Sequence, residues 1–121
     1  MSQQSLPPEV QQTLAQYQTM RDNYARLDVE IKLIEAELAD IENVLETLRN
    51  LKDEQEIYKM VGYILVKKKK EEVVSELEER KELLNIKREK YRKQLAVLEK
   101  QIKELESKLR ELLAKYGITI G

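Results

Sequence analysis

Residues 57–70 read IYKMVGYILVKKKK, a dense run of β-branched and aromatic side chains that ends in four lysines. Apart from Lys59 and Gly62, the first ten of these residues are apolar, a composition that fits β-strands buried on more than one side. Gly62 lies near the centre and can supply the positive φ of a tight turn. The segment therefore predicts a β-hairpin with arms over residues 56–61 and 63–69.

On the amino-terminal side of this run, apolar residues recur at alternating steps of four and three. That spacing predicts the seam of a left-handed coiled coil, carried by a helix over residues 8–51. Pro7 and Pro8 favour a helix start, because their missing N–H groups would lack intrahelical partners there, and Glu9 complements the helix dipole. The seam residues are Leu6, Val10, Thr13, Tyr17, Met20, Tyr24, Leu27, Ile31, Ile34, Leu38, Ile41, Leu45 and Leu48.

The same spacing continues after the lysines and predicts a second helix over residues 70–116. Lys81 and Arg88 occupy two seam positions, where polar side chains loosen a coiled coil or fix its register. Gly117 is a candidate C′ residue, since glycine adopts the left-handed conformation without a Cβ penalty. Two helices of similar length, each on the order of 65 Å, joined by a short segment predict an antiparallel helical hairpin with Leu6 near Tyr116.

The amino-acid composition argues against several classes of function. Of the 121 residues, 37% are charged and the formal net charge is −1, and the chain contains no cysteine and no histidine. Thiol nucleophiles, thiolate metal sites and the usual neutral-pH proton carrier are therefore missing. We expect a protein that is not an enzyme, needs no cofactor or metal, binds neither nucleic acid nor membrane, and works in the cytoplasm.

The apolar hairpin raises the question of what covers it. One alternative is a loop tucked against the ends of its own helices, but a two-helix coil is only one seam wide and a lone hairpin is marginally stable in water. Its open edges favour pairing with hairpins of other chains, closed into a barrel-like ring. The predicted assembly residues are Ile57, Tyr58, Met60, Val61, Gly62, Tyr63, Ile64, Leu65 and Val66.

The sequence here resembles the β-type subunits of prefoldin. Residues 57–84, IYKMVGYILVKKKKEEVVSELEERKELL, combine a YKxVGxxLVK hairpin with a VxxELxER entry into the second helix. The match rests on Tyr58, Lys59, Val61, Gly62, Leu65, Val66 and Lys67, and on Val74, Glu76, Leu77, Glu79 and Arg80. One hairpin between the helices, rather than two, is similar to the β type and not the α type.

This resemblance implies a mainly α protein in which a long antiparallel two-helix coiled coil carries one central β-hairpin, and the hairpins of several subunits build an oligomeric β-barrel platform. Residues 1–121 would form a single prefoldin-like domain, with residues 52–69 as the hairpin insert and residues 117–121 as a tail. The implied assembly is a hexamer of two α-type and four β-type subunits. Its implied function is ATP-independent capture of unfolded proteins and their delivery to a group II chaperonin.

We call the helix ends away from the hairpin the arm tip. The arm tip contains more apolar side chains than the end of a coiled coil requires for packing. Strict seam positions such as Val10 and Leu112 are explained by finishing the coil, so off-seam and tail residues are better candidates for client contact. One tip offers a small apolar patch, and several weak tips gripping one chain would give avidity. The predicted client-binding residues are Leu6, Val10, Leu14, Leu109, Leu113, Tyr116, Ile118 and Ile120.

Other readings of these features stay open at this stage. Lys67 to Lys70 could contact phosphates, but neighbouring Glu71 and Glu72 favour a solvated strand end that discourages unwanted pairing. Glu78 and Glu79 are neighbours on a helix that do not face one another, so we interpret them as surface charges. The rival functions are a purely structural coiled-coil spacer and, more remotely, a nucleic-acid-binding arm like the helical hairpin of a seryl-tRNA synthetase.

Overall fold

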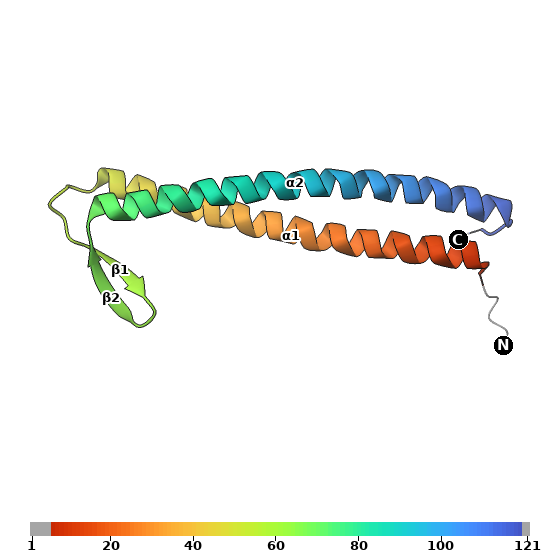
Figure 1. Ribbon diagram of the computed structural model, residues 1–121, viewed down its shortest axis with the longest axis horizontal. Coiled ribbons are helices and arrows are strands. Elements are labelled where there is room, and N and C mark those ends of the chain that lie inside the picture. The colour runs from red at the N-terminus through yellow and green to blue at the C-terminus, as the bar shows by residue number, and fades with distance from the viewer. Residues whose placement is uncertain (1–5, 120–121) are drawn as a thin grey trace. The chain divides into compact units, whose positions relative to one another are not determined.

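The structure is a computed structural model that describes residues 6–119. Its elements follow in the order α1 (Pro8–Asn50), β1 (Ile57–Val61), β2 (Ile64–Lys68) and α2 (Lys70–Lys115), as Figure 1 shows. The predicted fold class, two long helices with one β-hairpin between them, is confirmed. Both helices end one residue before the predicted limit, and the strands are shorter than the predicted arms because each begins one residue later and β2 ends at Lys68.

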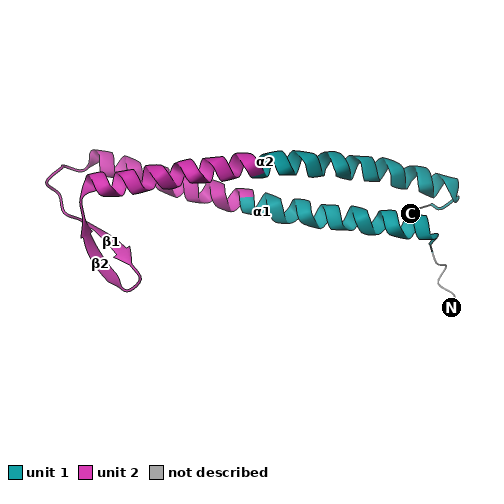
Figure 2. Ribbon diagram, in the orientation of Figure 1, with its two compact units in different colours: residues 1–30, 91–121 teal, residues 31–90 magenta. Residues whose placement is uncertain are grey.

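Internal contacts divide the chain into two compact units, drawn in different colours in Figure 2. One unit joins the start of α1, up to residue 30, to the part of α2 that begins at residue 91. The other spans residues 31–90 and holds the end of α1, the hairpin and the start of α2. We call them the tip unit and the hairpin unit.

The hairpin unit contains the more complete helical core. Its buried apolar side chains are spaced by three and four residues along α1 and are joined from α2 by Leu84, as the seam predicted. Lys81, a polar seam residue, is half-buried and pairs its ammonium with the Glu42 carboxylate of α1. The buried side chains of α1 here are Ile31, Ile34, Leu38, Ile41, Leu45 and Leu48.

The hairpin is a two-stranded antiparallel sheet whose register runs from Ile57 opposite Lys68 to Val61 opposite Ile64. Two residues, Gly62 and Tyr63, make the turn. Gly62 has a φ of 59° and Tyr63, like the other non-glycine residues between 6 and 119, has no positive φ, which is the pattern of a type II′ turn. The positive φ predicted for Gly62 is confirmed.

In the described part of the tip unit, the buried side chains lie near the helix ends. Val10, Thr13 and Leu112 are buried there. The intervening seam residues are half-buried, and Tyr17 turns its hydroxyl out to donate a hydrogen bond to Glu106 of α2 at 3.1 Å. The half-buried seam residues are Tyr17, Met20, Tyr24, Leu27, Tyr91, Leu95, Leu98, Ile102, Leu105 and Leu109.

The carboxyl end of α2 closes in a Schellman motif. The Gly117 N–H donates to the Ala114 carbonyl at 3.1 Å, and the Ile118 N–H donates to the Leu113 carbonyl at 2.8 Å. Gly117 has a φ of 63°, as predicted for a C′ residue. The motif folds the chain back after α2, which leaves Ile118 half-buried instead of trailing into solvent.

Candidate functional site

The hairpin has two unlike faces. Residues opposite one another in the ladder share a face, and every second pair lies on the same face. The pair Ile57 and Lys68 therefore lies on one face with the pair Lys59 and Val66. We call this the helix-side face, because both of its lysines reach α2 and Ile57 and Val66 are half-buried; its third pair, Val61 and Ile64 beside the turn, is exposed. The opposite face carries Tyr58, Met60, Leu65 and Lys67 and is called the open face.

A single carboxylate of α2 holds the helix-side face. Lys59 Nζ donates to Glu76 Oε2 at 2.9 Å, and Lys68 Nζ donates to Glu76 Oε1 at 3.4 Å. Lys68 also lies 4.0 Å from the Glu72 carboxylate. The hydrogen bond and charge of Lys59, followed by those of Lys68, lower the pKa of Glu76 below its ordinary value.

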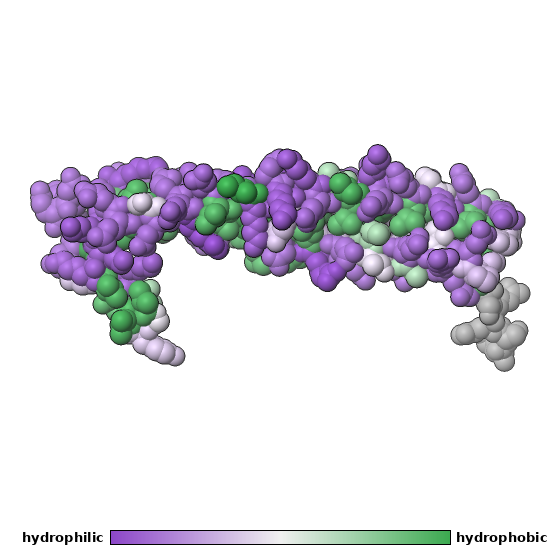
Figure 3. Space-filling model, viewed as in Figure 1, coloured by the Kyte–Doolittle hydropathy of each residue, from purple (hydrophilic) through white to green (hydrophobic). Residues whose placement is uncertain are grey.

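The open face is apolar and largely uncovered. Tyr58 is 51% exposed, Met60 73% and Leu65 63%. Figure 3 shows the same contrast, with hydrophobic surface gathered on the hairpin beside helices that are mostly hydrophilic on this side. Exposed apolar surface at a two-stranded sheet whose backbone edges are both open is a common feature of protein interfaces.

Polar groups border the open face at the base of the hairpin. The Tyr58 hydroxyl donates to the Glu56 carboxylate at 2.9 Å, and Lys67 Nζ lies 3.3 Å from the same carboxylate. The hydrogen bond from Tyr58 and the charge of Lys67 lower the pKa of Glu56, and the same hydrogen bond raises the pKa of Tyr58. The polar groups that border the open face thus have partners within the chain, while Met60 and Leu65 of that face are exposed.

The predicted assembly residues differ in exposure according to the face of the hairpin on which they lie. Ile57 and Val66 are half-buried on the helix-side face, whereas Tyr63 at the turn is fully exposed. The remaining apolar members of the set lie exposed on the open face or beside the turn: Tyr58, Met60, Val61, Ile64 and Leu65.

The lysine run is engaged with carboxylates of its own chain. Lys67 pairs with Glu56, Lys68 with Glu72 and Glu76, and Lys70 lies 3.5 Å from Asp53 while donating to the Leu51 carbonyl at 2.9 Å. Three of the four lysines are therefore neutralised locally. This arrangement favours a structural role at the hairpin base over a phosphate-binding patch.

At the arm tip, the predicted client-binding residues differ in exposure. Val10 is only 1% exposed and packs between the helices, whereas Tyr116 is 42% exposed. Ile120 lies outside the described residues. The others, Leu6, Leu14, Leu109, Leu113 and Ile118, are half-buried.

Polar contacts close the arm tip across the two helices. The Tyr116 hydroxyl donates to the Glu9 carboxylate at 2.8 Å, and Lys115 Nζ lies 3.7 Å from the same group. The hydrogen bond from Tyr116 and the charge of Lys115 lower the pKa of Glu9, and the Glu9 carboxylate raises the pKa of Tyr116. The start of α1 and the end of α2 are thereby joined at the surface.

A set of large apolar side chains that the heptad spacing does not predict is exposed along the helices. These residues lie between the seam positions, so the heptad spacing gives no signal for them. The signal that would have identified them is the presence of large apolar residues off the seam. Leu33 of α1 and Ile86 of α2 are each about 60% exposed. The full set is Val29, Leu33 and Val44 on α1, and Leu83, Ile86 and Val97 on α2.

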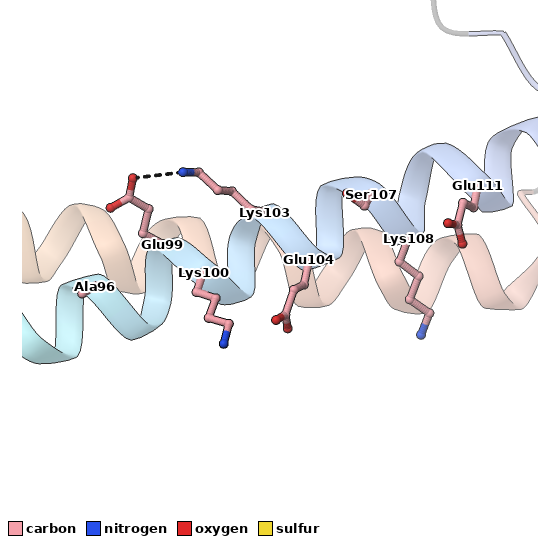
Figure 4. Close-up of a pocket in the computed structure, with 8 residues that line it drawn as sticks. All are labelled: Ala96, Glu99, Lys100, Lys103, Glu104, Ser107, Lys108 and Glu111. Carbon is pink, nitrogen blue, oxygen red and sulfur yellow. Dashed lines mark ion pairs between the residues drawn. The ribbon is translucent and has the colours of Figure 1, made fainter.

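Open, shallow hollows lie along the helices. A depression of about 720 Å³ is lined by residues of α2 alone, among them an ion pair of 3.6 Å between Lys103 and Glu99, shown in Figure 4. In that view Lys100, Glu104 and Lys108 extend away from the helix. Because a single helix cannot enclose a ligand, we assign it no site. Within residues 6–119 there is no group of three metal-ligating side chains, and neither helix is both long and apolar enough to cross a membrane.

Comparison with known proteins agrees with this architecture. A family described as "Prefoldin subunit" matches residues 11–116. The prefoldin subunit beta of Saccharolobus islandicus is 46% identical over 93% of this chain and 90% of its own length, and that of Sulfurisphaera tokodaii is 40% identical over 92% and 89%. The crystal structure of the prefoldin beta subunit from Thermococcus strain KS-1 superposes with a TM-score of 0.61 at 32% identity, covering 93% of both chains. The chain belongs to the prefoldin family of chaperone subunits and is of the β type.

Proposed function

We propose that this chain is a subunit of an ATP-independent holdase: its hairpin joins those of other subunits, and its arm tip binds unfolded proteins. The full particle is a hexamer of two α-type and four β-type subunits, located in the cytoplasm, which passes its clients to a group II chaperonin. The observation that carries this proposal is the open face of the hairpin, an apolar surface on a sheet whose two edges lack strand neighbours among the described residues.

Assembly follows from the hairpin's incomplete burial. Tyr58, Met60 and Leu65 present more than half of their surface to solvent, and covering a side chain of this kind contributes on the order of 2 kcal/mol. Edge-to-edge pairing with another hairpin supplies the missing backbone partners at the same time. Burial of the apolar side chains and pairing of the backbone edges both require a second chain. A closed ring of hairpins leaves no hairpin edge unpaired.

Client binding is assigned to the arm tip on chemical grounds. Leu6, Leu14, Leu113 and Tyr116 are partly exposed around the short buried core of Val10 and Leu112. Such small apolar patches bind any unfolded segment weakly and without a sequence-specific pocket. Several tips on one platform hold a chain by avidity and release it stepwise, which suits transfer to a chaperonin and needs no nucleotide.

The assembly step is tested by charge placed on the open face. We expect Leu65→Asp to abolish hexamer formation with an α-type subunit, measured by native mass spectrometry at fixed subunit concentration. Leu33→Asp is the matched control, since Leu33 is about as exposed but lies on α1. A Leu65→Asp chain that still forms the hexamer would refute assembly through the hairpin.

The client step is tested by truncation. Deleting residues 1–10 and 115–121 together should leave the hexamer intact but abolish suppression of client aggregation in the absence of ATP. A structural spacer, the alternative function, would show no suppression even at full length. Full suppression by the truncated hexamer would instead exclude the tip and direct attention to the exposed apolar residues along the helices, such as Leu33 and Ile86.

A further inference from the structure

Glu76 is the one α2 carboxylate that contacts lysines of both strands among the described residues. Lys59 on β1 binds its Oε2, and Lys68 on β2 binds its Oε1. A single ion pair would let the hairpin rotate about the contact. Two contacts, from two strands to two oxygens of one carboxylate, restrain both the tilt of the sheet and its rotation about the strand direction.

The covalent connection keeps the hairpin beside the start of α2 but leaves its tilt adjustable through the backbone bonds of one residue. Only Lys69 separates β2 from α2, and residues 51–56 separate α1 from β1. The Lys69 carbonyl accepts hydrogen bonds from the N–H groups of Glu72 and Val73, at 3.1 and 3.2 Å, and thereby fixes the first turn of α2. The helix start is thus anchored at Lys69, and the orientation of the sheet beyond it depends on side chains.

We propose that Glu76 is a positioning residue for assembly: by holding Lys59 and Lys68, it presents the open face of the hairpin to other subunits at a defined angle to the arm. This inference rests on the proposed assembly through the hairpin. Exposed ion pairs add little to the stability of a fold, and both partners here are partly solvated. Their effect is instead to order the hairpin before it binds, which reduces the entropy lost on association, and the gain recurs in every β-type subunit.

Charge reversal tests the proposal. Glu76→Lys places a third positive charge between Lys59 and Lys68, so we expect the subunit concentration for half-assembly to rise about tenfold, with helix content and melting temperature of the separate chain nearly unchanged. Lys59→Glu should weaken assembly similarly. The double variant Lys59→Glu with Glu76→Lys restores one pair with inverted charges, leaves Lys68 beside Glu72, and should recover most of the loss.

Two control variants distinguish a positioning role of Glu76 from a general effect of net charge. Glu82→Lys makes the same change of net charge on an exposed residue of the same helix, and should assemble as the wild type does. Glu76→Gln keeps the shape of the side chain, removes its charge, and should weaken assembly less than Glu76→Lys. Wild-type assembly by Glu76→Lys, or a double variant no better than the single variants, would overturn the proposal.

The Leu65→Asp and Glu76→Lys variants together distinguish failure of the positioning role from failure of the proposed assembly. If Leu65→Asp abolishes the hexamer while Glu76→Lys leaves it unchanged, assembly through the hairpin stands and the positioning role is wrong. If Leu65→Asp assembles normally, the hairpin is not the interface, and the positioning role is wrong with it.

Discussion

The Arg80 guanidinium of α2 donates two hydrogen bonds to the Glu37 carboxylate of α1, at 2.7 and 3.0 Å. This parallel pairing uses the planar fork of arginine and fixes both helices at one register. Arg80 belongs to the VxxELxER stretch, as does Glu76. Two polar residues of that stretch therefore act within the chain, one tying α2 to α1 and the other tying α2 to the hairpin.

The Arg80 pair predicts a pH dependence of stability. The hydrogen bonds and charge of Arg80 lower the pKa of Glu37 from its ordinary value of 4.5. The pair therefore stabilises the fold above pH 4.5, and this contribution is lost as the pH falls through the lower pKa of the folded state. Glu37→Gln should melt earlier than the wild type at pH 7, and the difference should shrink below pH 4.5. Glu46→Gln, an exposed neighbour on α1, should show no such convergence.

Truncation of Leu45 tests the core of the hairpin unit. Leu45 is 1% exposed, so Leu45→Ala should lower the free energy of unfolding by about 3 kcal/mol through lost burial and a cavity. Leu33→Ala removes the same atoms from a side chain that is 60% exposed and should change it by less than about 0.5 kcal/mol. Urea unfolding at one fixed subunit concentration compares them, because assembly contributes to apparent stability. Equal losses would contradict the assignment of Leu45 to the core.

The turn of the hairpin predicts a backbone effect at Gly62. No heavy atom lies within 4 Å of a Cβ built on Gly62, so substitution there causes no clash, but its φ of +59° is unfavourable for other residues. Gly62→Ala should destabilise the hairpin by about 1–2 kcal/mol, because the first central position of this turn type strongly favours glycine. Faster amide exchange in β1 and β2 of Gly62→Ala than in the wild type would support this. An unchanged rate in Gly62→Ala would contradict it.

The arm tip should respond to the loss of one hydroxyl. Tyr116→Phe removes the donor to Glu9, and we expect faster amide exchange in the first turns of α1 and the last turn of α2. Because the pKa of Glu9 is lowered, the contact stabilises the tip above pH 4.5 and is lost as the pH falls below that value. Because the pKa of Tyr116 is raised, the contact is also lost when the pH rises past the ordinary tyrosine value of 10.0. Tyr63→Phe at the exposed turn should leave tip exchange unchanged.

The sequence was sufficient to predict the elements, and their limits to within one residue, because each carries a local signal. The spacing of Ile31, Ile34 and Leu38 sets the buried side of α1, and Gly62 and Gly117 take the conformations that few other residues accept. Ion pairs between elements have no such signal. Glu76 is one of many glutamates on α2, and its contact with Lys59 depends on how the hairpin folds back onto the helix, which residue spacing alone does not give.

The client-binding residues at the tip were harder to judge from spacing. Val10 was included for its position near the helix start, yet it is buried, whereas Leu33 and Ile86 are exposed and were not included. Seam analysis identifies which side chains face the other helix, but it does not tell how far each is covered. Suppression of client aggregation by the truncated hexamer would distinguish the arm tip from exposed helix residues such as Leu33 and Ile86 as the client-binding surface.

The alternation of side chains along β1 and β2 also separates two evolutionary constraints. Lys59 and Lys68 match Glu76 in their own chain, whereas Met60 and Leu65 lie exposed and, in the proposed assembly, match only the surface of another subunit. A duplicated gene can therefore acquire a new partner by changing every second residue of one short sheet, without disturbing how its product folds. Diversification of subunits within such particles becomes a matter of a few codons.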